Sequence, residues 1–302
     1  MLANNNKMII NKLAKNSVKS NKKQYGILFF TIVLSAFMLF CVFTIGLTYL
    51  DSSRLQNTRL NGAEYDITTM NGFTSKQVKS LQSNKNIQNV GMESYAGFIK
   101  SSEFDNTVEI GLLWCDETFW NNLMSPARTK LDGHYPQNKN ELMVTKDILK
   151  ACGNENLSVG DSIVLTYENN TGVHTDKFVI SGIWDGYGDK SAGFVSKNFY
   201  DETGYDLKND GILCIKLNRN YVLPTTIQSL EKSLNFSDRQ IFAPTDYIEN
   251  SFKLLLGICG LALVICLSAY LLIYNILYLS ISGKIRYYGL LQSLGMTKKQ
   301  LV

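Results

Sequence analysis

The sequence has few of the residues on which metal and nucleophilic chemistry depend. It contains two histidines, His134 and His174, and neither has a possible metal ligand three or four positions away, so no zinc site is expected. It has no Gly-x-Ser-x-Gly nucleophile elbow and no Gly-x-x-x-x-Gly-Lys-Ser/Thr phosphate loop. These absences disfavour a hydrolase or a nucleotide-hydrolysing enzyme, and no cofactor is expected.

Cysteine is also too sparse for a disulfide framework. Three of the six cysteines lie in long apolar runs: Cys41, Cys259 and Cys266. They are interpreted as small packing residues. The other three lie between the runs: Cys115, Cys152 and Cys214. Three is an odd number and no Cys-x-x-Cys pair occurs, so at most one disulfide is left open among them.

Charge is missing from two long runs, residues 25–50 and 254–283. About 20 apolar residues in a helix cross a bilayer core of roughly 30 Å. Both runs are therefore predicted to be transmembrane helices. A cleaved signal peptide, the alternative for the first run, would have a shorter apolar region of about 7–15 residues.

The distribution of charge predicts the orientation. Residues 1–24 and 284–302 contain basic residues and no acid, whereas residues 51–253 contain 20 basic and 26 acidic residues, a net charge of −6. Basic residues that flank a membrane span stay in the cytoplasm. Both termini are therefore predicted to be cytoplasmic, in a multi-pass protein of the cell membrane. Because the large middle region is acidic, a nucleic-acid partner is not expected despite the overall pI of about 8.6.

The predicted organisation has five parts. They are a cytoplasmic basic amphipathic segment at 1–24, a first transmembrane helix at 25–50, an extracytoplasmic domain at 51–253, a second transmembrane helix at 254–283 and a cytoplasmic coupling segment at 284–302. The first segment is predicted to lie on anionic membrane lipid, with a disordered basic tail as the alternative.

The middle region has the pattern of an α+β domain with mainly antiparallel or mixed sheets, because strands and helices do not alternate regularly. Predicted strands are 66–70, 88–100, 107–114, 141–145, 162–167, 177–184 and 211–217. Predicted helices are 74–83 (with Thr74 as cap), 117–123, 145–150 and 225–234. Turns are predicted at 61–62, 71–72, 132–133, 159–161 and 185–188. Whether this region is one domain or two subdomains is left open.

Helical stalks are predicted at both ends of this domain. No Gly or Pro occurs from Asp51 to Leu60, so the first membrane helix is expected to continue to the breaker Gly62. Asp246 and Glu249 have capping-box spacing, so the second long helix is expected to begin there, before its apolar run.

The cytoplasmic end is predicted to form a helix, a glycine break and a second helix. Four apolar side chains share one face of the first helix: Tyr287, Leu290, Leu291 and Leu294. Gly295 is a plausible helix stop, and Thr297 and Gln300 have the spacing of a capping box. Such a helix could dock in the groove of a cytoplasmic partner or lie in the membrane interface, and periodicity alone favours neither.

This end of the chain resembles the cytoplasmic signature of FtsX/MacB-type ABC transporter permeases. That signature reads approximately Arg-x-x-Gly-x-Leu-[Lys/Arg]-x-[Leu/Ile]-Gly-x-[Ser/Thr]-x-x-Gln-[Ile/Leu]. The matching residues are Arg286, Gly289, Leu291, Leu294, Gly295, Thr297, Gln300 and Leu301. Tyr287 stands where many members carry Glu, and Gln292 stands where a basic residue is usual; these departures resemble the peptide-resistance branch of Gram-positive bacteria. Segments 133–136, 141–145 and 159–161 are also similar to the family's periplasmic core.

The resemblance implies a membrane protein in which two transmembrane helices flank a large extracytoplasmic mixed α/β domain of the MacB periplasmic-core type. It implies an ABC permease subunit of the mechanotransmission kind, which relays the motion of a separate ATPase to the outer domain and is not itself an enzyme. Family substrates include antimicrobial peptides, lipoproteins and cell-wall hydrolase regulators. Members have four or more spans, so this chain is expected to be an N-terminal half: a fragment, a truncated gene product or one piece of a split permease. The expected partner is a second copy or a second permease half.

The resemblance also assigns the ATPase-docking role to the coupling segment. The residues that carry it are Arg286, Tyr287, Gly289, Leu291, Leu294, Gly295, Thr297 and Gln300. The alternative is a two-span sensor, whose outer domain detects a ligand and signals through a cytoplasmic partner. A membrane-anchored outer-surface enzyme has no supporting constellation of residues.

Overall fold

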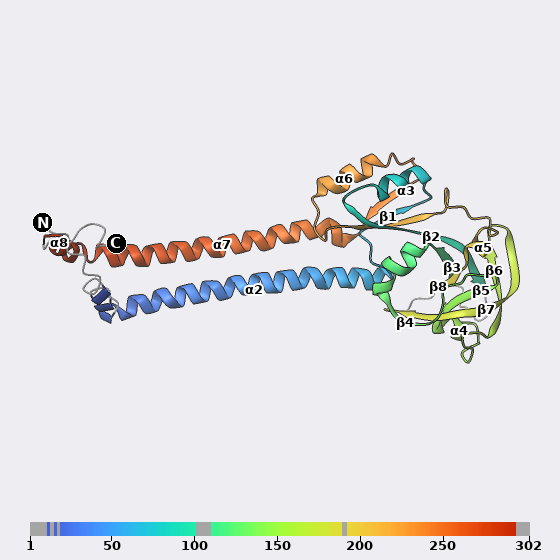
Figure 1. The fold of residues 1–302 in the computed structure, drawn as a ribbon, viewed down its shortest axis with the longest axis horizontal. Helices are drawn as coiled ribbons and strands as arrows, with labels where there is room; N and C mark the ends of the chain where they lie inside the picture. The colour runs from blue at the N-terminus through green and yellow to red at the C-terminus, as the bar shows by residue number, and fades with distance from the viewer. Residues whose placement is uncertain (1–10, 13–14, 17–18, 101–109, 189–191, 294–302) are drawn as a thin grey trace. The chain divides into compact units, whose positions relative to one another are not determined.

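The computed structural model describes residues 11–12, 15–16, 19–100, 110–188 and 192–293 (Figure 1). The chain divides into two compact units between Tyr49 and Leu50 and between Leu254 and Leu255. We call the unit that spans residues 50–254 the sheet unit and the remainder the helical unit.

Two long helices form most of the helical unit and also contribute residues to the sheet unit. Helix α2 spans Lys22–Asn61 and helix α7 spans Asp246–Ser282, with 40 and 37 residues. Both are long and apolar enough to cross a membrane, as the charge-free runs predict. Their apolar side chains are largely exposed, which suits contact with lipid. A shorter helix, α8, follows at Ile285–Ser293.

The predicted stalk boundaries are close to those observed. Helix α2 ends at Asn61, directly before Gly62, whose φ of 74° is favourable for glycine. Helix α7 begins at Asp246, but the predicted capping box was misplaced by one residue. Thr245 is the capping residue, because its side chain accepts the Ile248 N–H at 3.5 Å.

Within the helical unit, α2 and α7 approach closely at a glycine. A Cβ atom placed on Gly46 would lie 2.7 Å from Cδ1 of Ile258, whereas one placed on Gly26 would meet nothing within 4 Å. Small residues allow helices to approach in a membrane, where dispersion contacts hold them together. Gly46 therefore identifies the helix–helix contact.

We expect Gly46→Leu to lower the thermal unfolding midpoint of the detergent-solubilised protein, because the leucine would separate the helices at Ile258. Gly26→Leu is the matched control in the same helix, and it should leave the midpoint unchanged or raise it, because leucine favours helix more than glycine by up to about 1 kcal/mol. Equal effects of the two variants, measured by differential scanning fluorimetry, would show that the contact is unimportant.

The sheet unit contains one mixed sheet of ten strands in the described part of the chain. The strands are β1 Ile67–Met70, β2 Ile87–Lys100, β3 Ile110–Cys115, β4 Arg128–Gly133, β5 Glu141–Thr145, β6 Ser162–Asn169, β7 Gly172–Gly186, β8 Ala192–Val195, β9 Ile212–Leu217 and β10 Ile241–Pro244. Their order is β10-β1-β9-β2-β3-β8-β5-β7-β4, and β6 pairs with both β2 and β7. The β3–β8 and β5–β7 pairs are parallel and the other pairs antiparallel, so the predicted mixed sheet is confirmed.

Short helices cover the sheet. They are α3 Ser75–Gln82, α4 Lys146–Ala151, α5 Lys197–Tyr200 and α6 Pro224–Ser233, together with a π-helix at Phe119–Leu123 and a 3₁₀ turn at Ser125–Ala127. Helices α3 and α6 lie beside β1 (Figure 1). They contribute Leu81, Ile227 and Leu230 to a cluster of buried side chains that also includes residues of β1 and β9. Two further clusters bury the centre of the sheet and the aromatic residues around Trp120 and Trp184.

Thr74 caps α3 through a capping box with Gln77, as predicted for Thr74. Strands β4, β8 and β10 and helix α5 were not predicted. The turn predicted at Asp132-Gly133 is wrong, because both residues lie in β4 and pair with β7. The turn predicted at 185–188 begins too early, because β7 continues through Gly186.

Candidate functional site

The predicted coupling segment is only partly within the described residues. Helix α8 contains Arg286, Tyr287, Gly289 and Leu291. Leu294, Gly295, Thr297 and Gln300 lie outside the described residues, so the predicted glycine break and second helix remain predictions.

Apolar side chains of α8 are exposed. The side chains of Tyr287 and Leu290 are 48% and 64% exposed, and a Cβ atom added to Gly289 would meet nothing within 4 Å. A helix that shows a tyrosine and a leucine beside an open glycine can fit closely into a groove of a partner. This geometry suits the docking role that the resemblance assigns.

A second group of residues lies in the sheet unit, where α2 ends and α7 begins. It is a series of ion pairs among Arg54, Glu64, Asp66 and Lys216, which we call the joint. Thr245 belongs to the joint through a backbone hydrogen bond. The Arg54 and Glu64 side chains are 3.8 Å apart, Glu64 and Lys216 are 3.2 Å apart, and Lys216 and Asp66 are 3.5 Å apart. Arg54 belongs to α2 and Lys216 to β9, so these charges tie the helix to the sheet.

Asp66 is the centre of the joint. Its backbone N–H donates to the Ile215 carbonyl at 2.9 Å, and its carboxylate accepts the Leu217 N–H at 2.8 Å. Its own carbonyl accepts the N–H of Thr245, the residue that caps α7, at 2.8 Å. Asp66 therefore connects β9 to the start of α7, and Lys216 and Glu64 extend this connection to Arg54 of α2.

The Lys216–Asp66 pair of the joint is buried, and this sets its electrostatics. The Lys216 and Asp66 side chains are 7% and 2% exposed, so the ammonium is held by carboxylates instead of water. Burial raises the pKa of Asp66, although Lys216 and the Leu217 N–H act to lower it. The Lys216 ammonium is the principal compensation for two carboxylates in this interior.

Tyr247, in the first turn of α7, adds to this connection. It is buried, and its hydroxyl donates to the Asn220 carbonyl at 3.3 Å. Burial raises its pKa, and the nearby Arg54 charge acts in the opposite direction. Tyr247 is therefore close to the α2 residue that begins the joint.

Sequence reasoning missed the joint, although two signals were present. Lys216 interrupts the apolar strand Ile212–Leu217, and a cation in such a strand needs a buried acid. Glu64 and Asp66 follow the helix-ending Gly62 directly, so they had to lie where α2 meets the sheet. Their pairing across about 150 positions of sequence could not be read from spacing.

A further buried carboxylate lies in the middle of the sheet. Glu93 of β2 is opposite Cys115 of β3 and Ile212 of β9, and it accepts the Cys214 thiol at 3.7 Å. Burial raises its pKa from 4.5 to about 7, while the thiol acts to lower it. The folded domain therefore favours the protonated form of Glu93.

The stability of the domain should consequently fall as the pH rises. A carboxyl group whose pKa is raised on folding contributes stability below its unfolded pKa, and that contribution is lost as the pH rises through the folded value. We expect the free energy of unfolding to fall by on the order of 2 kcal/mol from about pH 5 to about pH 8. Glu93→Gln should flatten this part of the profile, measured by urea unfolding; identical slopes in the two proteins would contradict the assignment.

The structure contains no disulfide among the six cysteines, all of which are described. Cys115 and Cys214 are buried thiols. Among the described residues, no group of three or more His, Cys, Asp or Glu side chains is placed to hold a metal ion.

No protein-family model and no curated protein sequence matches this chain. Among solved structures, it is similar to the periplasmic region of MacB from Actinobacillus actinomycetemcomitans, with a TM-score of 0.41 and 13% identity over 64% of this chain and 95% of that one. It is also similar to the extracellular domain of the noncanonic ABC-type transporter YknZ from Gram-positive bacteria, with a TM-score of 0.39 and 11% identity over 60% of this chain and 99% of that one. At these identities the likeness is one of fold alone.

Proposed function

We propose that this chain is a membrane permease subunit of an ABC transporter of the FtsX/MacB type, in which a separate ATPase binds the cytoplasmic side. The observation that carries the proposal is α8, an exposed apolar helix that carries Arg286, Gly289 and Leu291 of the coupling motif directly after a membrane-length helix. The basic ends and the acidic middle region support cytoplasmic termini.

The joint gives the proposal a mechanical element. Helices α2 and α7 each contribute residues to both units. In the joint, Asp66 connects β9 to the start of α7, and the Arg54–Glu64–Lys216 ion pairs connect β9 to α2. Since protein interiors transmit strain instead of absorbing it, a movement of either helix would reach the sheet through this connection. Such a relay fits a mechanotransmission permease, with a substrate of the antimicrobial-peptide or lipoprotein class and a dimer or a second permease half as partner.

Co-expression with candidate ABC ATPases from the same organism tests the proposal. We expect the two proteins to co-purify from detergent and the ATPase to hydrolyse ATP at a different rate in the complex. If the chain co-purifies with none of the ATPases tested, or co-purifies with a signalling protein instead, the two-span sensor is favoured.

A further inference from the structure

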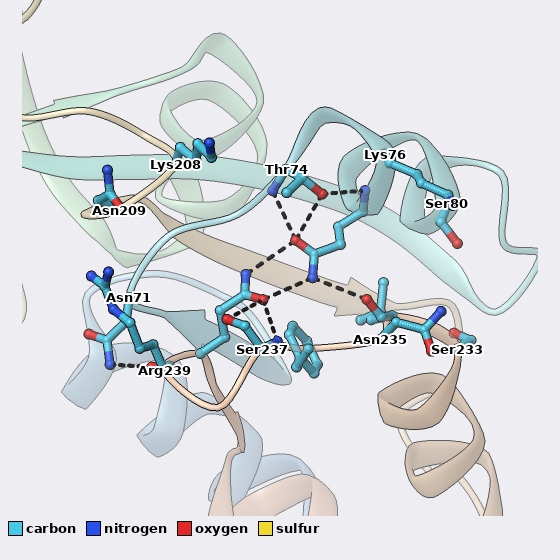
Figure 2. Close-up of a pocket in the computed structure, with 14 residues that line it drawn as sticks. Asn71, Thr74, Lys76, Ser80, Lys208, Asn209, Ser233, Asn235, Ser237 and Arg239 are labelled. Atoms are coloured by element: carbon cyan, nitrogen blue, oxygen red, sulfur yellow. Dashed lines mark hydrogen bonds between the residues drawn. The ribbon is translucent and has the colours of Figure 1, made fainter.

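A cavity of about 530 Å³ opens beside the start of α3 in the sheet unit (Figure 2). Its walls come from α3, from residues 208–209 and from the segment that joins α6 to β10. This volume is within the range of about 300–1,000 Å³ that is usual for small-molecule sites. The cavity is separate from α8 and from the joint, since no residue of either lines it.

The floor of the cavity is a reciprocal pair of glutamines. The amide groups of Gln77 and Gln240 exchange two hydrogen bonds of 3.2 Å. Gln77 also accepts the Thr74 N–H at 2.9 Å, and Gln240 donates to the Gly72 carbonyl at 2.7 Å. Gln77 is 7% exposed and fully bonded, so the floor is formed before any ligand arrives.

The rim is held by a tight turn. Asn71 and Gly72 have φ values of 65° and 88°, and a Cβ atom on Gly72 would lie 1.9 Å from the Lys208 carbonyl oxygen. The Asn71 side chain donates to the Arg239 carbonyl at 2.8 Å. The backbones of Lys208 and Arg239 are thus fixed on opposite sides of the turn.

The charge of the lining is one-sided. Lys76, Lys208 and Arg239 line the cavity, and no carboxylate is present among the described residues that line it. None of the three cations forms an ion pair within 4.0 Å in the described structure. In a region whose net charge is −6, three unpaired cations at one cavity favour an anion. Arginine and lysine together suit phosphate oxygens.

The remaining lining points to a ligand with more than a phosphate. It consists mainly of amide and hydroxyl side chains, which match the hydroxyl groups of a sugar. Phe236 adds a half-buried aromatic surface, held against Phe242 with 5.7 Å between ring centroids. We propose that this cavity binds a sugar phosphate, with the phosphate held by cations of the lining and the sugar beside the glutamine pair.

Two sources could present this chemistry: a soluble sugar phosphate, or a lipid whose headgroup is a phosphorylated sugar. The proposal does not depend on the transporter assignment, because it uses only residues of the sheet unit. Its failure would leave the binding of an ATPase untouched.

Isothermal titration calorimetry on the full chain in detergent tests the site. The soluble arm uses glucose 1-phosphate, with glucose and inorganic phosphate as partial ligands, and the lipid arm uses short-chain phosphatidylinositol 4-phosphate. We expect at least one of the two complete ligands to bind at least tenfold more tightly than glucose or phosphate alone. The arm with the higher affinity identifies the source.

The variant Lys76→Gln/Arg239→Gln should weaken that binding at least tenfold. Lys146→Gln/Lys150→Gln makes the same change of charge on exposed residues of α4 that do not line the cavity, and it should change the affinity less than twofold. Three results would overturn the proposal: no binding in either arm, equal binding of inorganic phosphate, or equal effects of the two double variants.

Discussion

Replacing Lys216 with alanine is expected to lower the thermal unfolding midpoint of the sheet unit by about 10 °C. The change leaves the Glu64 and Asp66 carboxylates in the joint without the buried ammonium that lies 3.2 and 3.5 Å from them. Removing one partner of a buried ion pair costs about 3–5 kcal/mol, and each kcal/mol lowers the midpoint by about 2–4 °C in a domain of this size. The midpoint is measured by near-UV circular dichroism of the full chain in detergent.

Two control variants test whether this effect is specific to the joint. Lys146→Ala removes an exposed lysine of α4 and should lower the midpoint by less than about 2 °C. Lys216→Met combined with Asp66→Asn removes both a cation and an anion, so it should lose less stability than Lys216→Ala alone. If Lys216→Ala behaves like Lys146→Ala, the joint does not hold the helices to the sheet.

The second large effect is expected at the coupling helix. Leu291→Asp should weaken binding of the ATPase by at least about 30-fold, because a charge would enter an apolar contact where a single anchor contributes about 2 kcal/mol or more. Binding is measured by biolayer interferometry with the ATPase immobilised. The unfolding midpoint of the sheet unit should not change, since Leu291 lies in the helical unit.

Gln292→Asp is the matched control for this prediction. It introduces the same charge one position along α8, at an exposed residue off the predicted apolar face. We expect at most a threefold change in affinity. Equal losses in the two variants would mean that charge alone, and not the apolar face, governs binding.

The sequence predicted the elements whose signals are local. The charge-free runs predicted α2 and α7, the breaker Gly62 predicted the end of α2, and Thr74 predicted the start of α3. Each of these signals lies in one continuous stretch of sequence. The mixed sheet also followed from the order of strands and helices.

The missed strands lack such local signals. Strand β4, Arg128–Gly133, is mostly exposed and shows no alternation of apolar and polar residues. Strand β8, Ala192–Val195, is short and contains a glycine, and β10 ends in a proline. These segments are strands because neighbouring strands pair with them, which a local pattern cannot reveal.

The same distinction between local signals and contacts of distant segments applies to the candidate sites. The coupling motif was found because its residues are adjacent in sequence. The joint and the glutamine pair were not found, because Asp66–Lys216 and Gln77–Gln240 are contacts between distant segments of chain. Only the fold brings these partners together.

Topology is the central claim of this account, and epitope accessibility in intact cells tests it most directly. One tag is placed at the N-terminus and another is inserted in the exposed hairpin turn at Asn170-Thr171, between β6 and β7. We predict that antibody reaches the hairpin tag from outside intact cells and reaches the N-terminal tag only after permeabilisation. An N-terminal tag that is accessible in intact cells would contradict the predicted orientation and the proposed docking of a cytoplasmic ATPase.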